Sequence, residues 1–207
     1  MPEIDRGVCS PRALDRILAE LRVHGISVSD GFLESREVRE LAECAALRRA
    51  RGDFVEARIG ADSNLQRRED IRGDRISWLG EAAFPAETLV LGLLEQLRRC
   101  LNERAYLGLF DLEIHYAWYP CGAAYARHVD QPQGRVRRRV SLVLYLNEQW
   151  SAADGGTLRI RADDGQFRDI EPLGGRLVLF LCESREHEVL LTRSPRLSLT
   201  GWFRGRE

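Results

Sequence analysis

Apolar residues in the first part of the chain recur with the spacing of an amphipathic helix. Ser10 followed by Pro11 is typical of a helix start, because serine caps a free N–H group and proline is tolerated in the first turn. The apolar positions that follow share one helix face: Leu14, Ile17, Leu18 and Leu21. Gly25 is a typical end signal, so we predict a helix that is capped by Ser10, begins at Pro11 and ends near His24–Gly25.

The same spacing predicts two more helices in the first half of the chain. Ser35 is expected to cap a helix whose inward positions are Val38, Leu41, Ala42 and Ala45. A third helix is predicted over residues 86–102, with an apolar stripe made of Leu89, Val90, Leu93, Leu94 and Leu97. The sequence of residues 25–31, between the first two helices, predicts a short strand and a turn.

From Leu109 onward the pattern changes to short stretches that alternate apolar and polar residues or are fully apolar. The predicted strands are Leu112–Tyr119, Arg139–Leu146, Gly156–Arg161, Arg176–Leu181, Glu188–Leu191 and Leu197–Phe203. Closely spaced strands without intervening helices indicate an antiparallel sandwich or barrel. We therefore predict an α+β fold with a double-stranded β-helix core of the jelly-roll or cupin-like type, and N-terminal helices packed on one sheet.

No internal repeat, low-complexity tract or Pro/Ser-rich linker divides the sequence. A chain of 207 residues is long enough for one well-buried core and short for two. We expect a single domain over residues 1–207. In this domain residues 1–105 form mainly helical support, and residues 106–207 form the double-stranded β-helix core.

Composition narrows the classes of partner. The formal net charge of −1 gives no basic field for nucleic acid or a membrane surface, so neither is expected as a partner. No apolar run approaches membrane-spanning length, and the first residues lack the apolar stretch of a secretory signal. The five cysteines are odd in number and scattered, which favours reduced thiols. We expect a cytoplasmic protein.

Two histidines and one aspartate form a candidate metal site. His128 and Asp130 are two positions apart in an extended segment, so both side chains project to the same side, and His187 must come from another strand. Two imidazoles and one carboxylate are the ligands of non-haem Fe(II) oxygenases. Arg196 offers a planar fork that can hold the carboxylate of a 2-oxo acid. The competing interpretation is a simple His128–Asp130 pair, with His187 at a strand end.

A set of short motifs surrounds these residues. They are Asp70–Trp78 (D-I-R-G-D-x-I-x-W), Tyr119–Pro120 (Y-P), Tyr125–Asp130 (Y-x-R-H-V-D), Leu144–Asn147 (Y-Y-L-N, with Leu144 in place of the first Tyr), Trp150, Gly155–Ile160 (G-G-x-L-R-I), Phe167–Pro172 and His187–Val189. Together they resemble the prolyl 4-hydroxylase branch of the 2-oxoglutarate- and Fe(II)-dependent dioxygenases, in particular the oxygen-sensing prolyl hydroxylase domain proteins and their bacterial relatives. The resemblance covers residues 70–203.

This resemblance implies roles for the matching residues. The iron ligands are expected to be His128, Asp130 and His187, and these three with Arg196 form the expected catalytic set. The co-substrate 2-oxoglutarate is expected to contact Arg196, Tyr145, Thr200 and Tyr119. The substrate entrance is expected to contain Tyr125, Arg138, Trp202 and Arg72. Arg137 and Arg139 compete with Arg138 for its position, and Arg72 belongs to a predicted lid-like loop over residues 64–78.

The activity that the resemblance implies is hydroxylation of a proline within a protein. It needs Fe(II), 2-oxoglutarate and O2, with ascorbate as a further candidate. Elongation factor Tu is the specific candidate substrate. One alternative is the same chemistry on a free amino acid, a small metabolite or an alkylated base, since fold does not fix substrate. The other is a non-catalytic binding protein that responds to iron or to a 2-oxo acid.

Overall fold

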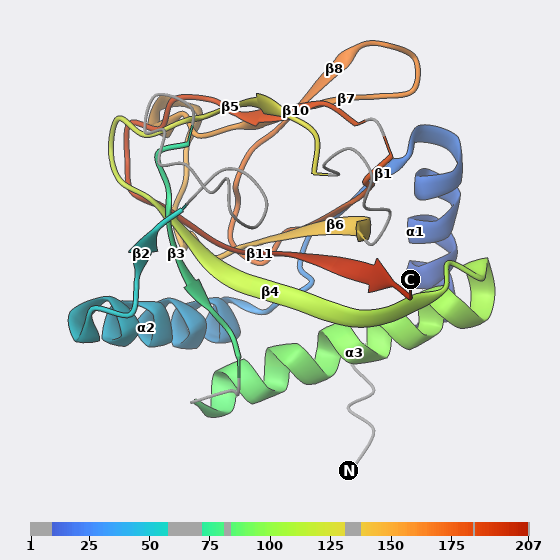
Figure 1. The fold of residues 1–207 in the computed structure, drawn as a ribbon, viewed down its shortest axis with the longest axis horizontal. Coiled ribbons are helices and arrows are strands. Elements are labelled where there is room, and N and C mark those ends of the chain that lie inside the picture. Colours follow the sequence, from blue (N-terminus) through green and yellow to red (C-terminus); the bar gives the residue numbers. More distant parts are fainter. Residues whose placement is uncertain (1–9, 58–71, 81–83, 131–137, 184, 207) are drawn as a thin grey trace.

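The computed structural model describes residues 10–57, 72–80, 84–130, 138–183 and 185–206, which form two facing antiparallel sheets with helices on one side (Figure 1). The helices are α1 (Pro11–His24), α2 (Ser35–Arg51), α3 (Pro85–Ala105) and a 3-10 turn at Ala152–Asp154. The strands are β1 (Ile26–Ser29), β2 (Val55–Glu56), β3 (Arg75–Trp78), β4 (Leu109–Tyr119), β5 (Tyr125–His128), β6 (Arg138–Tyr145), β7 (Leu158–Arg161), β8 (Phe167–Ile170), β9 (Leu177–Leu181), β10 (His187–Val189) and β11 (Arg196–Gly205). The predicted α+β class and double-stranded β-helix core are confirmed.

The two sheets differ in size and in what covers them. The large sheet has the order β1-β9-β6-β11-β4-β3-β2, and the small sheet has the order β5-β10-β7-β8. Strand β11 lies inside the large sheet and pairs with β4 on one side and β6 on the other. Figure 1 shows α2 and α3 below the large sheet and the small sheet above it, so the predicted packing of helices on one sheet is confirmed.

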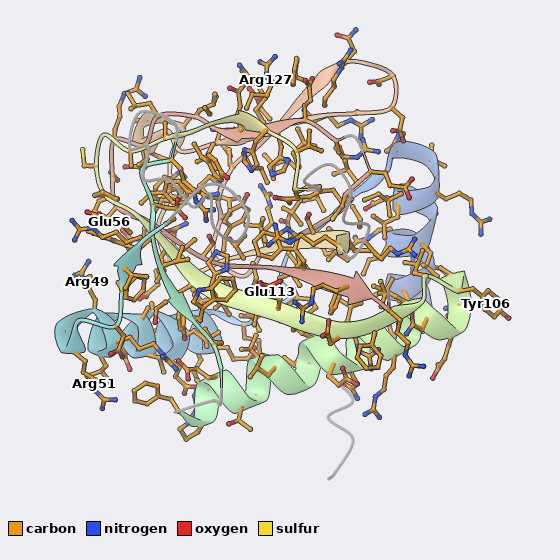
Figure 2. The ribbon with its side chains drawn as sticks, in the orientation of Figure 1. Arg49, Arg51, Glu56, Tyr106, Glu113 and Arg127 are labelled. Carbon is orange, nitrogen blue, oxygen red and sulfur yellow. The ribbon has the colours of Figure 1, made fainter. Side chains whose placement is uncertain are left out.

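Alternate residues of a strand point to opposite sides of a sheet, and the large sheet carries apolar residues on both sides. On β4, Ile114 and Tyr116 belong to the core shared with the helices. Ala117 and Tyr119 belong instead to the core between the two sheets. Figure 2 shows side chains filling this space, whereas Tyr106 at the end of α3 points outward. The large sheet therefore separates two apolar cores, one shared with the helices and one between the sheets.

Local signals set most helix ends. The Ser10 hydroxyl accepts the Ala13 N–H at 3.3 Å, and Gly25 ends α1 with φ +64°, a conformation that glycine adopts without strain. The prediction that Ser35 caps the second helix is wrong by one residue. Glu34 is the cap, and its N–H donates to the Glu37 carboxylate at 3.0 Å.

All predicted strands are present, with ends displaced by three residues or fewer. The strand predicted from Gly156 begins at Leu158, because Gly155 and Gly156 have φ +68° and +62° and form a turn. Four strands were not predicted: β2, β3, β5 and β8. Strand β3 lies inside the predicted loop over residues 64–78, so that prediction is wrong at residues 75–78, while residues 64–71 lie outside the described part.

None of the described helices is long and apolar enough to cross a lipid bilayer.

Candidate active site

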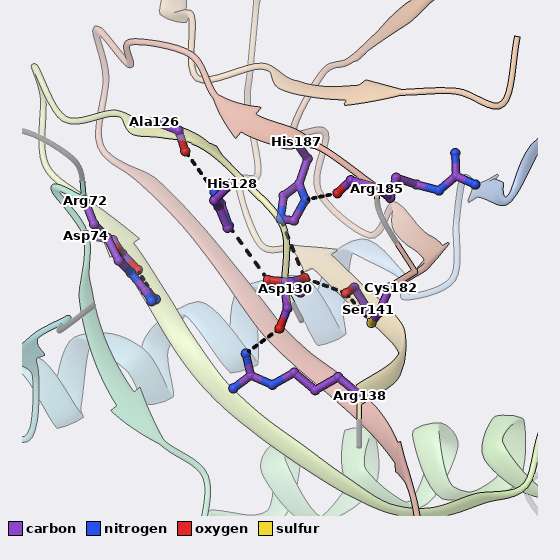
Figure 3. A network of polar contacts seen from close by, with 10 residues as sticks. All are labelled: Arg72, Asp74, Ala126, His128, Asp130, Arg138, Ser141, Cys182, Arg185 and His187. Atoms are coloured by element: carbon purple, nitrogen blue, oxygen red, sulfur yellow. Dashed lines mark hydrogen bonds and ion pairs between the residues drawn. The ribbon is translucent and has the colours of Figure 1, made fainter. Parts of the chain in front are cut away.

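Three potential metal ligands converge between the sheets. His128 ends β5 and is paired in register with His187 at the start of β10, and Asp130 follows β5 directly. The Asp130 carboxylate oxygens lie 3.7 Å from His128 Nε2 and 3.6 Å from His187 Nε2. Two ligands of one ion, each about 2.1 Å from it, are at most about 4.2 Å apart. Both measured distances fall within that limit, so these residues fit a single metal ion (Figure 3).

Backbone carbonyls orient both imidazole rings. His128 Nδ1 lies 2.8 Å from the Ala126 carbonyl oxygen, and His187 Nδ1 lies 3.1 Å from the Arg185 carbonyl oxygen (Figure 3). A carbonyl only accepts, so each Nδ1 carries the proton and donates it. Each Nε2 therefore presents its lone pair toward Asp130, as a metal ligand must. Burial lowers the pKa of His128 to about 4, which keeps this ring neutral at pH 7.

The Asp130 carboxylate is held ionised and in a fixed orientation. Burial alone would raise its pKa, but the two histidines and the Ser141 hydroxyl outweigh burial, and the pKa lies below its usual value. Ser141 Oγ donates to Asp130 Oδ2 at 2.5 Å and lies 3.0 Å from the buried Cys182 thiol. Two imidazoles with an ionised carboxylate are a donor set that fits Fe(II).

Ser141→Ala is expected to weaken metal binding about tenfold, because groups that orient a metal ligand typically contribute 10- to 100-fold in affinity. The measurement is an anaerobic Fe(II) titration against a competing chelator. Ser141→Thr restores the hydroxyl and should bind iron as the parent does. Equal affinities in the parent and Ser141→Ala would show that Ser141 does not support Asp130.

Arg196 lies in the buried interior of the same cavity. Its side chain is 2% exposed, and its Nε donates to the Gly156 carbonyl at 2.9 Å. The guanidinium lies 5.0 Å from the ring centroids of both Tyr119 and Tyr145. Among the described residues no carboxylate pairs with Arg196. A buried cation normally has an anionic partner, so the arrangement suits a carboxylate ligand.

A second polar group beside Arg196 also lacks a partner. The Tyr145 hydroxyl is buried and accepts or donates no hydrogen bond of ordinary geometry within the described part of the chain. Burial raises the pKa of the Tyr145 phenol, which keeps the hydroxyl protonated as a donor. Thr200 also lies along the cavity, with Oγ1 3.2 Å from Ser198 Oγ. The structure therefore brings together all four residues predicted to contact a 2-oxo acid.

The predicted entrance residues also gather at this cavity. The Tyr125 ring stacks on the His128 ring with centroids 3.7 Å apart, and the Arg72 guanidinium lies 4.8 Å from the Tyr125 centroid. Asp74 holds Arg72 by two hydrogen bonds of 2.7 and 3.1 Å. Burial would lower the pKa of Arg72, but Asp74 outweighs burial and raises it. Arg72 is therefore a fixed cation beside the metal site.

The structure describes two of the three consecutive arginines, Arg138 and Arg139. Arg138 donates to the Asp130 carbonyl at 3.2 Å and lies 3.4 Å from the Trp202 ring centroid. Arg139 is exposed, and Arg137 lies outside the described residues. Arg138 and Trp202 both border the cavity, which has a volume of about 510 Å³. Of the two described arginines, Arg138 is thus the one that faces the site.

His115 and Trp78 are among the cavity residues that the sequence analysis did not assign to the site. His115 lies on the same face of β4 as Tyr119, four positions away, and is 1% exposed. Trp78 on β3 is the backbone partner of His115 on β4, and it is 45% exposed. The period-two alternation that places Tyr119 inward also places His115 inward, so that signal could have found it. Trp78 required the strand β3, which the sequence pattern did not predict.

Metal-free protein is expected to lose stability as pH falls, in part through His115. Burial lowers the pKa of folded His115 to about 3 from an ordinary value of 6.5. Below pH 6.5 the His115 ring is protonated in the unfolded chain but stays neutral in the folded chain, so acid favours unfolding. His115→Leu should gain stability over the parent by up to about 1.4 kcal/mol per pH unit below pH 6.5. Urea unfolding at pH 7, 6 and 5 measures this difference, and a constant difference would contradict the assignment.

Comparisons with known proteins agree with this geometry. Residues 114–204 match the model of the 2OG-Fe(II) oxygenase superfamily. The human protein Egl nine homolog 1 is 33% identical over 201 residues, which cover 92% of this chain and 46% of the human protein. This chain therefore spans about half the length of that curated relative.

Two solved structures share most of the fold. A prolyl-4-hydroxylase from Pseudomonas putida is 43% identical with a TM-score of 0.85, covering 94% of this chain and 100% of that one. A prolyl hydroxylase from Trichoplax adhaerens, in complex with a hypoxia inducible factor peptide fragment, is 26% identical with a TM-score of 0.85, covering 93% and 89%. The chain belongs to the prolyl hydroxylase branch of the 2OG-Fe(II) oxygenases, which confirms the family predicted from its motifs.

Proposed function

We propose that this protein is a 2-oxoglutarate- and Fe(II)-dependent dioxygenase that hydroxylates a prolyl residue in a protein substrate. One observation carries the proposal. A single cavity of about 510 Å³ brings a His-Asp-His cluster together with the buried guanidinium of Arg196, which no described carboxylate pairs with. A metal site alone would suit many proteins, whereas the added carboxylate site is what a 2-oxo acid co-substrate requires.

In this proposal each residue has a defined task. His128, Asp130 and His187 would hold Fe(II). Bound iron supplies the activation of dioxygen that couples decarboxylation of 2-oxoglutarate to hydroxylation of a C–H bond. The protein's share is positioning, since correct placement of reactants removes much of the barrier.

The buried polar groups would orient the co-substrate. Arg196 binds the distal carboxylate bidentately, and the Tyr145 hydroxyl and Thr200 donate to it or to its neighbours. Tyr119, which lies beside Arg196 along the cavity, would be a further contact of the co-substrate. The aromatic rings beside Arg196 exclude water and so strengthen these contacts. Ascorbate remains a candidate reductant that keeps the iron in the Fe(II) state.

Features of the cavity mouth support a protein substrate. Trp78 and Val129 are 45% and 39% exposed and border the cavity, which suits contact with an extended chain. Tyr125, Arg72, Arg138 and Trp202 would contact the segment that carries the proline. We propose elongation factor Tu as the target, on the resemblance to bacterial members of this branch, and the cytoplasm as the place where the two meet.

The test is to incubate host-cell lysate with iron-loaded protein and 2-oxoglutarate and to map new +16 Da sites by mass spectrometry. We expect a modified proline, with elongation factor Tu as its carrier, and none in a parallel sample that contains Asp130→Ala. A modified proline in another protein would overturn only the proposed target. Turnover of 2-oxoglutarate with free amino acids or bases, and no modified proline, would overturn the protein substrate.

A further inference from the structure

His115 is a buried polar residue without an assigned task in this cavity. It lies on β4, where its backbone is paired with Thr200 on β11 and with Trp78 on β3. Its side chain is 1% exposed and borders the cavity that contains the metal cluster. Its ring lies between two tryptophans, 4.7 Å from the Trp78 centroid and 5.6 Å from the Trp202 centroid.

Neither ring nitrogen of His115 has a hydrogen-bond partner among the residues that the structure describes. Leaving a buried polar atom unpaired destabilises a protein, and such atoms are uncommon in folded chains. Leucine or methionine would fill this apolar position without that cost. An imidazole that faces a cavity and is unpaired there is therefore placed to bind something that enters the cavity.

The ring is available as a hydrogen-bond donor. Burial lowers the pKa of His115 to about 3, so the ring is neutral at pH 7. A neutral imidazole carries one N–H donor and one acceptor nitrogen. A proline within a peptide has no backbone N–H, so its only backbone hydrogen-bonding group is its carbonyl, which accepts. The residues on either side also present carbonyl acceptors to an approaching donor. The donor of His115 is therefore complementary to the peptide on either side of a target proline.

His115 lies at a distance from Arg196, although its backbone partner Thr200 is one of the residues proposed to contact the co-substrate. Arg196 is paired with Tyr119, four residues along β4 from His115, which corresponds to about 13 Å between the Cα atoms of His115 and Tyr119. Asp130 is hydrogen-bonded to Ser141 on β6, whereas His115 is on β4, across β11 from Ser141. Its neighbour Trp78 is 45% exposed, so His115 lies toward the open side of the cavity.

We infer that His115 binds the substrate peptide beside the target proline, by donating a ring N–H to a backbone carbonyl. This inference rests on the proposed function and adds a substrate-positioning residue to it. The two tryptophans hold the ring in place on either side. The hydrogen bond forms only in the complex, so the free protein carries the unpaired group.

Kinetics of three variants test the inference. The probe is a synthetic peptide centred on the proline that the lysate experiment maps. His115→Leu should raise the KM for this peptide about three- to tenfold, the effect of one lost hydrogen bond, and leave the KM for 2-oxoglutarate within about twofold. His115→Gln keeps a donor and should stay near the parent. Tyr145→Phe is the matched control, which should raise the KM for 2-oxoglutarate and leave that for the peptide.

A raised KM for 2-oxoglutarate in His115→Leu, with an unchanged peptide KM, would assign His115 to the co-substrate and overturn the inference. Unchanged values for both would overturn it as well. If the parent itself modifies no proline, the proposed function fails instead, so the two failures are distinguishable.

Two further measurements exclude a merely structural role. His115→Leu should raise the Tm at pH 7 by about 2–4 °C, because it removes an unpaired buried group; a structural role predicts a fall. In NMR spectra of Zn(II)-loaded protein with 2-oxoglutarate, the peptide should shift the His115 ring resonances, assigned by their loss in His115→Gln. Ring resonances that do not move at saturating peptide would contradict the inference.

Discussion

Asp130→Ala is expected to abolish 2-oxoglutarate turnover. The carboxylate is the sole acidic ligand candidate in the cluster, and both histidine Nε2 atoms face it at 3.6–3.7 Å. Groups that only orient a metal ligand contribute 10- to 100-fold, so loss of the ligand itself should exceed about 100-fold. Succinate formation measures the activity, and an anaerobic Fe(II) titration measures metal content in the same samples. Both should fall together.

The control for Asp130→Ala is Asp164→Ala, which removes an exposed carboxylate from the turn between β7 and β8. It should retain parental turnover and iron content. Circular dichroism of each variant checks that the fold persists. Full activity in Asp130→Ala would show that the His-Asp-His cluster is not the iron site.

Arg196→Lys is expected to raise the KM for 2-oxoglutarate about 10- to 100-fold with a smaller change in kcat. Lysine keeps the positive charge but loses the planar fork and the Nε donor to Gly156. A hydrogen bond to a charged group contributes about 1.5–3 kcal/mol, and each 1.4 kcal/mol is a tenfold change in affinity. Initial rates at varied 2-oxoglutarate measure the shift.

Arg193→Lys is the matched control for Arg196→Lys, since Arg193 is exposed and only three positions away. It should leave the KM for 2-oxoglutarate unchanged. A thermal unfolding curve separates weaker co-substrate binding from a damaged core, because Arg196 is 2% exposed. An unchanged KM in Arg196→Lys would place the co-substrate carboxylate elsewhere.

The sequence was most informative where chemistry and local geometry coincide. His128 and Asp130 are two positions apart, which fixes a common side for their side chains before any tertiary contact is known. The motif order then linked them to His187 and Arg196, far along the chain. The structure places all four along one cavity. Helix ends at Ser10 and Gly25 were predictable for the same reason, because capping depends on adjacent residues.

The sequence was least informative where a strand depends on a distant partner. Arg75–Trp78 has no strong strand pattern, and it is extended because β4 pairs with it along its length. Strand β8 contains Arg168 and Asp169 and is held by its hairpin partner β7. Strand propensity is weak and strongly dependent on context, so such elements are decided by pairing rather than by composition.

The supporting residues of the site were also beyond the sequence pattern. Ser141 lies in an apolar strand, where the sequence gives no reason for a hydroxyl. The structure supplies the reason, because Ser141 Oγ donates to Asp130 Oδ2 at 2.5 Å. His115 belongs to no motif, and only the folded structure shows that its ring nitrogens have no hydrogen-bond partner among the described residues. Hydrogen-bond satisfaction is a property of the assembled structure.

The sequence by itself determined the fold class, the family and the identity of the metal-ligand candidates, because periodicity, capping and motif order act locally along the chain. The tertiary structure alone decided that Arg138 rather than Arg139 borders the site and that β3 contributes to the cavity mouth. It also decided that, among the described residues, Arg196 is buried without a carboxylate partner and the Tyr145 hydroxyl and His115 ring are buried without hydrogen-bond partners. These facts depend on distances between residues far apart in the chain. Such distances are set only in the folded chain, where the two sheets pack against each other around the cavity.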